Sequence, residues 1–243
     1  MKRLALLLLP TVCGFVLLVA QEKSSTPPAQ DDDAEVNLPD TVATKAIGIY
    51  TGKLGDLNMS LSLDKIVGQT MMGYSIVEDN ERAFSGAWTQ ADGGIRIVAK
   101  EPGDHPFDGV FELAFQQGSN RLVGEWTPYD KKLAPAKLEL ARKEFKYNPK
   151  LGKYPQSSTR LLKEKDVENM RPSELRIMRS EIYARHGYCF RLADMRDHFN
   201  ETDWYIPVSV DIVARLTDIE KKNEALIKRY EKYGEEYYDG FGR

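Results

Sequence analysis

The side chains best suited to binding or catalysis gather in one short stretch, from Glu181 to His186. This stretch supplies a carboxylate, the phenol of Tyr183, the guanidinium of Arg185 and an imidazole. A guanidinium and an imidazole can hold an anionic group, and a phenol can hydrogen-bond to a sugar hydroxyl. If these groups project together into a cleft, they predict a site for an anionic or sugar-like ligand.

Two other interpretations of the same residues stay open. Glu181 and Arg185 are one helical turn apart with the acid first, so they can instead pair along a helix surface for roughly 0.2–0.5 kcal/mol. Alternatively, His186 can act as an acid–base in a hydrolase, with Glu181 or Arg185 in support.

Two adjacent aromatic residues, Trp204 and Tyr205, follow in a turn closed by Pro207. They can cap a small hydrophobic core, or their rings can stack on a sugar. The second possibility adds them to the same candidate site as Tyr183.

A helix must position these groups, and both of its ends can be read from the sequence. Pro172 suits the first helical position because its missing N–H would be unpaired there in any case. Apolar residues then recur at helical spacing and direct one stripe toward a core. Gly187 predicts the end, since glycine adopts the left-handed conformation after a helix without steric cost.

The pentapeptide at the end of this helix resembles the signature of the YARHG domain. The resemblance covers roughly Ser158 to Tyr233, and it rests on Tyr183-Ala184-Arg185-His186-Gly187 together with Leu175, Met178, Arg179, Glu181, Ile182, Phe190, Phe199, Trp204 and Tyr205. Two positions depart from the pattern: Ser180 stands where asparagine is common, and Arg171 where a serine or threonine N-cap is usual. The resemblance implies a short helical module of bacterial extracytoplasmic proteins, facing the cell envelope, with no established catalytic residues.

Residues 1–20 combine basic Lys2 and Arg3 with an apolar run that ends at Ala20. This pattern predicts a cleaved secretory signal peptide and a secreted or periplasmic protein. A persisting membrane anchor and lipidation at Cys13 are the alternatives. Residues 21–44 are rich in Ser, Thr, Pro and Asp and predict a disordered linker.

From residue 45 to residue 144 the hydrophobic period changes to strict alternation, which predicts an antiparallel meander of eight strands closed as an up-and-down β-barrel. The layout is similar to that of the lipocalin and avidin group of small barrels, by analogy of fold alone. The expected strands are Ile47–Leu54, Met59–Asp64, Thr70–Ile76, Arg82–Trp88, Gly94–Lys100, Gly109–Gln116, Arg121–Thr127 and Lys137–Arg142.

Several strands pair a glycine with an aromatic residue two positions on, so that both face the same side. Glycine permits sharp coiling of the sheet, and the aromatic ring fills the space beside it. The barrel can therefore be filled by side chains or can hold one small ligand. In the second case the expected lining residues are Tyr50, Tyr74, Trp88, Phe111 and Trp126.

The C-terminal part predicts a small all-α module, which makes the whole chain an α+β protein of two domains. Residues 145–157 mix lysine, proline and glycine and predict a linker. Residues 158–233 form the helical domain, and residues 234–243 a flexible tail. Besides the central helix, we expect helices at Lys163–Met170 and Leu192–Asn200, and one from the capping box Thr217-x-x-Glu220 to about Tyr233.

Composition and motifs narrow the possible functions. The formal net charge of −3 and pI near 5.8 give no basic surface, so we expect neither nucleic acid nor an anionic membrane surface as a main partner. We also expect no integral membrane insertion after signal cleavage. No phosphate loop, dinucleotide fingerprint, nucleophile elbow or HExxH motif occurs. Cys189, His186 and His198 match no metal-ligand spacing. We therefore expect no cofactor and no metal.

Together these features predict an exported, non-catalytic binding or interaction protein of the bacterial cell envelope. Its helical module would dock on a wall or surface component, such as peptidoglycan or a surface protein, through Glu181, Tyr183, Arg185, His186, Trp204 and Tyr205. Small-molecule binding in the barrel is the first alternative, and an envelope hydrolase is the second.

Overall fold

The computed structural model describes residues 41–103, 105 and 107–237. The expected signal peptide, most of the expected N-terminal linker and the end of the expected tail lie outside these residues. Within the described residues the first regular element is the short helix α1 (Val42–Lys45), inside the stretch expected to be a linker. Ala43 and Ala46 of this segment are fully buried in the barrel core, so the barrel domain includes α1.

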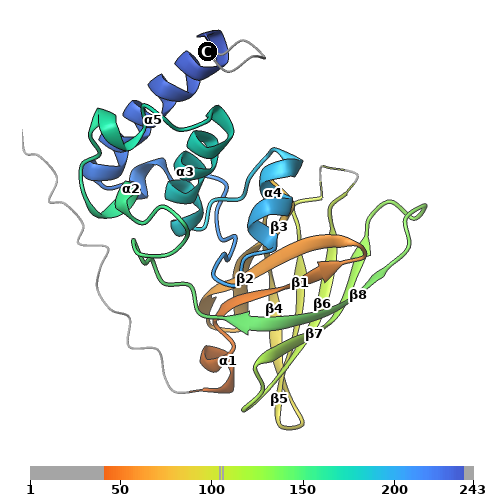
Figure 1. Cartoon of the computed structure of the whole chain (residues 1–243). Coiled ribbons are helices and arrows are strands. Elements are labelled where there is room, and N and C mark those ends of the chain that lie inside the picture. The colour runs from red at the N-terminus through yellow and green to blue at the C-terminus, as the bar shows by residue number, and fades with distance from the viewer. Residues whose placement is uncertain (1–40, 104, 106, 238–243) are drawn as a thin grey trace, which may run out of the picture. The chain divides into compact units, whose positions relative to one another are not determined.

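Eight antiparallel strands follow in chain order and close into a barrel (Figure 1), as the alternating pattern predicted. Each strand pairs with the next, and the last pairs with the first through Thr51 and Ala141, so no strand edge remains exposed. The strands are β1 (Gly48–Leu54), β2 (Leu57–Val67), β3 (Thr70–Val77), β4 (Asn80–Ala91), β5 (Gly94–Lys100), β6 (Gly109–Gln116), β7 (Arg121–Pro128) and β8 (Ala136–Lys143).

Glycines on the inner face let neighbouring strands approach each other closely. A Cβ atom on Gly86 would overlap the backbone carbonyl of Val98, and one on Gly124 would overlap that of Glu112. The paired aromatic residues fill the interior, with Phe111 almost completely buried against Phe84 at a ring-centroid distance of 5.3 Å. The predicted role of the glycine–aromatic pairs is therefore confirmed.

One end of the barrel is closed by a hydrogen-bonded aromatic cluster around Tyr50. The Tyr50 hydroxyl donates to the carbonyl of Ala46 (2.7 Å) and accepts from Arg142 (2.6 Å). The guanidinium of Arg142 lies 5.1 Å from the ring centroid of Tyr50 and 5.4 Å from that of Phe115. Because Tyr50 is fully buried and both hydrogen bonds of its hydroxyl lie within this cluster, it stabilises the closed end and does not line a ligand cavity.

The helical module is built around α3 (Pro172–Arg185), which begins and ends where the sequence predicted. Its C-terminus passes into Gly187 with φ of 73°, the left-handed conformation that favours glycine. The helix expected at Lys163–Met170 is wrong in length, since only the 3-10 turn η1 (Glu164–Asp166) forms there. The other elements are α2 (Gln156–Thr159), α4 (Ala193–Asn200), the 3-10 turn η2 (Val213–Arg215) and α5 (Asp218–Tyr237).

The last helix begins with the reciprocal capping box that its sequence predicted. The Glu220 amide donates to the Thr217 hydroxyl (3.2 Å), and the Thr217 amide donates to the Glu220 carboxylate (2.9 Å). The helix continues beyond Tyr233 into the expected tail. Among the residues that the structure describes, no helix is both long enough and apolar enough to cross a membrane.

Candidate functional site

The pentapeptide points its charged side chains into the interior of the helical module. The guanidinium of Arg185 is buried and makes five hydrogen bonds, so every donor group of this side chain is used. Its partners are the carbonyls of Leu151 (2.8 Å) and Tyr154 (3.0 Å), the hydroxyls of Ser157 and Ser158 (both 2.9 Å) and the carboxylate of Glu181 (2.8 Å).

The hydrogen bonds of Arg185 also show that residues 145–157 belong to the helical module. Leu151, Tyr154 and Ser157 lie within residues 145–157, which the composition predicted to be a linker. The Glu181 carboxylate accepts two further bonds from this segment, from the amides of Lys153 (2.7 Å) and Tyr154 (2.8 Å). Since four residues of the segment are fixed by α3, it folds as part of the module.

His186 takes part in a second buried network, centred on the Glu220 carboxylate. Its Nε2 lies 2.8 Å from a Glu220 oxygen, and its ring stacks on Tyr147 with a centroid distance of 4.4 Å. Burial alone would raise the pKa of Glu220, but hydrogen bonds from His186, Ser158 and Thr217 lower it to about 2. The Tyr147 hydroxyl donates to Glu220 (3.1 Å), and burial together with this carboxylate raises the pKa of Tyr147 to about 12.

These networks correct the expectation that Arg185 and His186 contact a ligand directly. Arg185 is 2% exposed and His186 is 5% exposed, so neither reaches the surface. The alternative interpretation predicted that Glu181 and Arg185 pair on a solvent-exposed helix surface. The two residues do pair, but their side chains are buried. The sequence could not show whether Arg185 is buried or exposed, because the residues that cover it, 151–158, come well before α3 in the chain.

Two of the other expected site residues are also occupied by internal contacts. The hydroxyl of Tyr183 donates to Glu224 (3.1 Å), and burial together with this carboxylate raises the pKa of Tyr183 to about 12. The hydroxyl of Tyr205 donates to the carbonyl of Tyr188 (2.7 Å), and its ring packs near Phe190. Tyr205 therefore caps the small aromatic core, which was one of its two expected roles.

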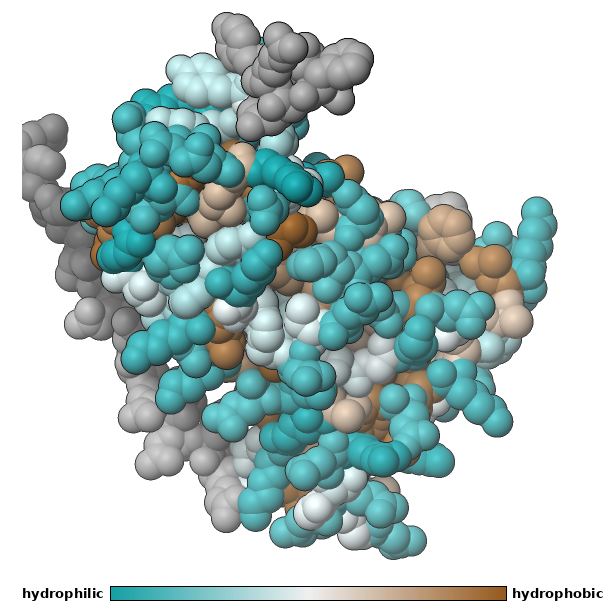
Figure 2. All heavy atoms as spheres, in the orientation of Figure 1, coloured by the Kyte–Doolittle hydropathy of each residue, from teal (hydrophilic) through white to brown (hydrophobic). Residues whose placement is uncertain are grey.

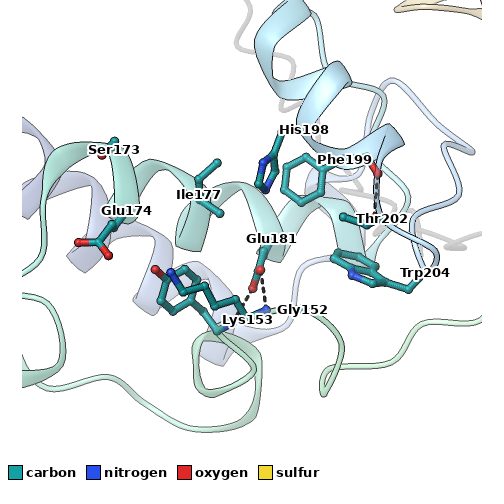
Figure 3. Close-up of a pocket in the computed structure, with 11 residues that line it drawn as sticks. Gly152, Lys153, Ser173, Glu174, Ile177, Glu181, His198, Phe199, Thr202 and Trp204 are labelled. Atoms are coloured by element: carbon teal, nitrogen blue, oxygen red, sulfur yellow. Dashed lines mark hydrogen bonds between the residues drawn. The ribbon is translucent and has the colours of Figure 1, made fainter.

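Glu181 and Trp204 do come together, in a groove of about 610 Å³ on the helical module. Figure 3 shows α3 and α4 facing each other across this groove, with Trp204 at one end and the Gly152–Lys153 loop along the side. The residues that line it are Gly152, Lys153, Tyr154, Ser173, Glu174, Ile177, Glu181, His198, Phe199, Thr202 and Trp204.

The groove combines an apolar floor with polar groups on its rim. Ile177 and Phe199 supply the floor, and the edge of Trp204 contacts the Phe199 ring at a centroid distance of 6.0 Å. Lys153 and His198 are exposed on opposite sides, so their polar atoms remain available to a ligand. An aromatic ring beside a few polar groups is typical of a site for an amphipathic ligand such as a sugar.

Sequence reasoning missed most of the groove, although part of its signal was present. Glu174, Ile177 and Glu181 recur at helical spacing and share one face of α3. Nothing in the sequence indicated that Lys153 and His198 would lie beside this face, because α4 and residues 152–154 reach it only through tertiary contacts.

The five aromatic residues expected to line a barrel cavity do not share one. Tyr74 faces outward, and its hydroxyl donates to the carbonyl of Val208 (2.8 Å), which makes its assignment wrong. The half-buried Trp88 donates its ring N–H to the carbonyl of Gly68 (3.1 Å). Phe111 and Trp126 are the two that line a cavity, at the end of the barrel opposite Tyr50.

The comparisons with known proteins bear on the helical module. No curated protein and no solved structure matches this chain. The family model of the YARHG domain matches residues 153–232. This match begins within the segment that binds Arg185 and ends within α5, so it covers most of both buried networks and of the groove between α3 and α4; Tyr147, Leu151 and Gly152 lie just before it. The C-terminal helical module is therefore a YARHG domain, as its pentapeptide indicated.

Proposed function

We propose that this protein is an exported, non-catalytic binding protein of the cell envelope, and that its YARHG domain docks on the glycan of the wall through the groove at Trp204. YARHG domains are typical of extracellular proteins, which supports an envelope location. The observation that carries the proposal is the Trp204 ring, half-exposed at the end of a polar-rimmed groove.

The groove chemistry suits a wall fragment made of sugars and short peptides. The ring of Trp204 can stack on the apolar face of a pyranose. His198 can exchange hydrogen bonds with hydroxyl and acetamido groups, since a histidine ring both donates and accepts. The Thr202 hydroxyl donates to the Phe199 carbonyl (2.7 Å) and can still accept a hydrogen bond from the ligand. Lys153 is exposed beside the groove and can pair with a peptide carboxylate.

The buried pentapeptide network contributes indirectly to this function. Arg185 and Glu181 tie residues 151–158 to α3, and this attachment places Lys153 beside the groove. The pentapeptide thus acts as a positioning element, and the ligand contacts come from residues around it.

Cosedimentation of the full chain with purified peptidoglycan tests the proposal. Trp204→Ala is expected to weaken binding about tenfold, because stacking on one aromatic ring contributes roughly 1–2 kcal/mol. Lys153→Ala should weaken binding severalfold, whereas Lys150→Ala, an exposed lysine outside the groove, should leave it unchanged. Circular dichroism establishes that each variant is folded.

Two results would overturn the proposal. Binding to peptidoglycan that Trp204→Ala and Lys153→Ala leave intact would place the contact elsewhere. No retention on peptidoglycan, together with retention on a protein fraction of the envelope, would show that a surface protein is the partner.

A further inference from the structure

A second cavity lies at the open end of the barrel, opposite the Tyr50 cluster, and nothing in the proposed wall-binding function uses it. Its volume is about 470 Å³, in the range of small-molecule sites. The turns and loops that follow β1, β3, β5 and β7 surround its mouth. Phe111 and Trp126 lie deeper, where the filled interior begins.

The mouth of this cavity is unusually apolar. Leu57 is 46% exposed, Phe107 57% and Leu133 37%, and all three line the cavity. In Figure 2 hydrophobic spheres gather at the right-hand edge of the molecule, where Figure 1 places the β5–β6 and β7–β8 loops. An exposed apolar rim around a concave site indicates a ligand with an apolar body.

A buried carboxylate, Glu101, lines the same cavity. It is 4% exposed and accepts hydrogen bonds from the ring N–H of Trp126 (3.0 Å), the amide of Gly109 (2.8 Å) and the hydroxyl of Ser75 (3.1 Å). All three donors are neutral. No ion pair to Glu101 occurs among the residues that the structure describes. Burial raises the pKa of Glu101, which reflects the cost of keeping this carboxylate charged without a cation.

The other charged groups that line the cavity already have partners. Arg82 pairs with one oxygen of Asp108, and the other oxygen of this carboxylate accepts from the backbone amides of Gly103 and His105 in the β5–β6 loop. Glu78 and Asp79 lie 3.4 Å and 3.9 Å from the guanidinium of Arg196. Glu101 is therefore the acidic group in the described lining that has no ion-pair partner, so an incoming cation would meet a buried carboxylate held only by neutral donors.

We propose that the open end of the barrel binds a small apolar molecule that carries a positively charged amine, with the ammonium group held by the Glu101 carboxylate. The rings of Phe107, Phe111 and Trp126 line the same space, and aromatic rings attract a cation through their π faces. The apolar body of the ligand then covers Leu57 and Leu133 at the mouth. This site is independent of the groove in the YARHG domain.

Isothermal titration calorimetry on the full chain at pH 7 tests the site with three probes of equal chain length. These are n-octylamine, octan-1-ol and octanoate, which are cationic, neutral and anionic at this pH. Octylamine is expected to bind about tenfold more tightly than octanol, and octanoate more weakly than both, because only the ammonium gains a charge-assisted hydrogen bond.

Two substitutions locate the site. Glu101→Gln keeps the shape of the side chain and removes its charge, so octylamine should fall to the affinity of octanol. Glu112→Gln, an exposed glutamate on the next strand, is the matched control and should change nothing. Phe107→Ala should weaken octylamine binding severalfold without loss of fold, since this ring is largely exposed, and it serves if Glu101→Gln fails to fold.

The proposal is overturned if octylamine and octanol bind equally, if octanoate binds best, if Glu101→Gln retains the preference for the amine in a folded protein, or if none of the probes binds. Peptidoglycan binding is measured separately, so either function can fail without affecting the test of the other.

Discussion

Replacing Arg185 is expected to be among the most damaging single changes in the helical module. The residue is the third letter of the pentapeptide, and the structure makes it an internal support. Arg185→Met keeps much of the length and apolar volume of the side chain but removes all five hydrogen bonds. The carbonyls of Leu151 and Tyr154 then lose a donor, and the buried Glu181 carboxylate loses its cation.

The expected loss in the free energy of unfolding follows from these lost contacts. Removing one partner of a buried ion pair typically costs about 3–5 kcal/mol, because the remaining charge stays buried without compensation. Here Glu181 keeps two backbone amide donors, so we expect the lower half of that range, about 3–4 kcal/mol. A change of this size is a large fraction of the 5–15 kcal/mol that stabilises a typical domain.

Urea unfolding followed by circular dichroism at 222 nm measures this effect. The signal reports mainly on the YARHG domain, since α2 to α5 lie there and α1 has four residues. Arg229→Met is the matched control. This arginine pairs with Glu164 at 3.2 Å, but both side chains are about half exposed or more, and such pairs contribute at most about 1 kcal/mol.

A double-mutant cycle with Glu181→Gln separates the pair from the rest of the network. The coupling free energy between positions 181 and 185 should be about 1.5–3 kcal/mol, the range for buried charge-assisted contacts. If Arg185→Met costs no more than the Arg229→Met control, with an unchanged denaturant slope, the internal role of the pentapeptide is refuted.

Three further predictions concern single groups. Glu220 has a folded pKa of about 2, below its ordinary value of 4.5, so its carboxylate stabilises the fold above pH 4.5 and this contribution, roughly 3 kcal/mol, is lost as the pH falls toward 2. Glu220→Gln should flatten the unfolding free energy measured across that interval, and an unchanged slope would argue against the network. Gly86→Ala should destabilise the barrel by about 1–3 kcal/mol or more in thermal unfolding, because a Cβ atom there would overlap backbone that cannot move aside. The control Ala87→Ser, at an outward-facing position, should have little effect. Burial raises the pKa of the Cys189 thiol to about 12, so in a Cys13→Ser background alkylation at pH 8 should be slow in the native protein and rapid in urea; fast native labelling would contradict the burial.

Local signals in the sequence predicted the barrel well. Most of the strands alternate apolar with polar residues and are joined by turn-forming residues, and each of these features is decided within a few residues of the chain. The closure of the sheet also had a local signal, the glycine that repeats two positions before an aromatic residue. The same reasoning failed at Tyr74, whose contact with Val208 involves a distant segment that the strand pattern does not encode.

In the helical module, by contrast, the sequence predicted the helices but not the accessible site. Pro172 and Gly187 fix the ends of α3, and Thr217 with Glu220 fixes the start of α5, since capping is a contact between residues three or four apart. The pentapeptide, together with the apolar and aromatic residues around it, likewise identified the YARHG domain.

Only the tertiary structure decided what the pentapeptide does. The local sequence cannot show whether an arginine at the end of a helix faces solvent or is covered by another part of the chain, because burial depends on distant segments. Here residues 151–158 fold over α3 and accept four of the five hydrogen bonds of Arg185, while His198 and Trp204 line the groove from another side. The sequence by itself therefore determined the elements and the domain family, and long-range packing determined which side chains remain accessible to a partner.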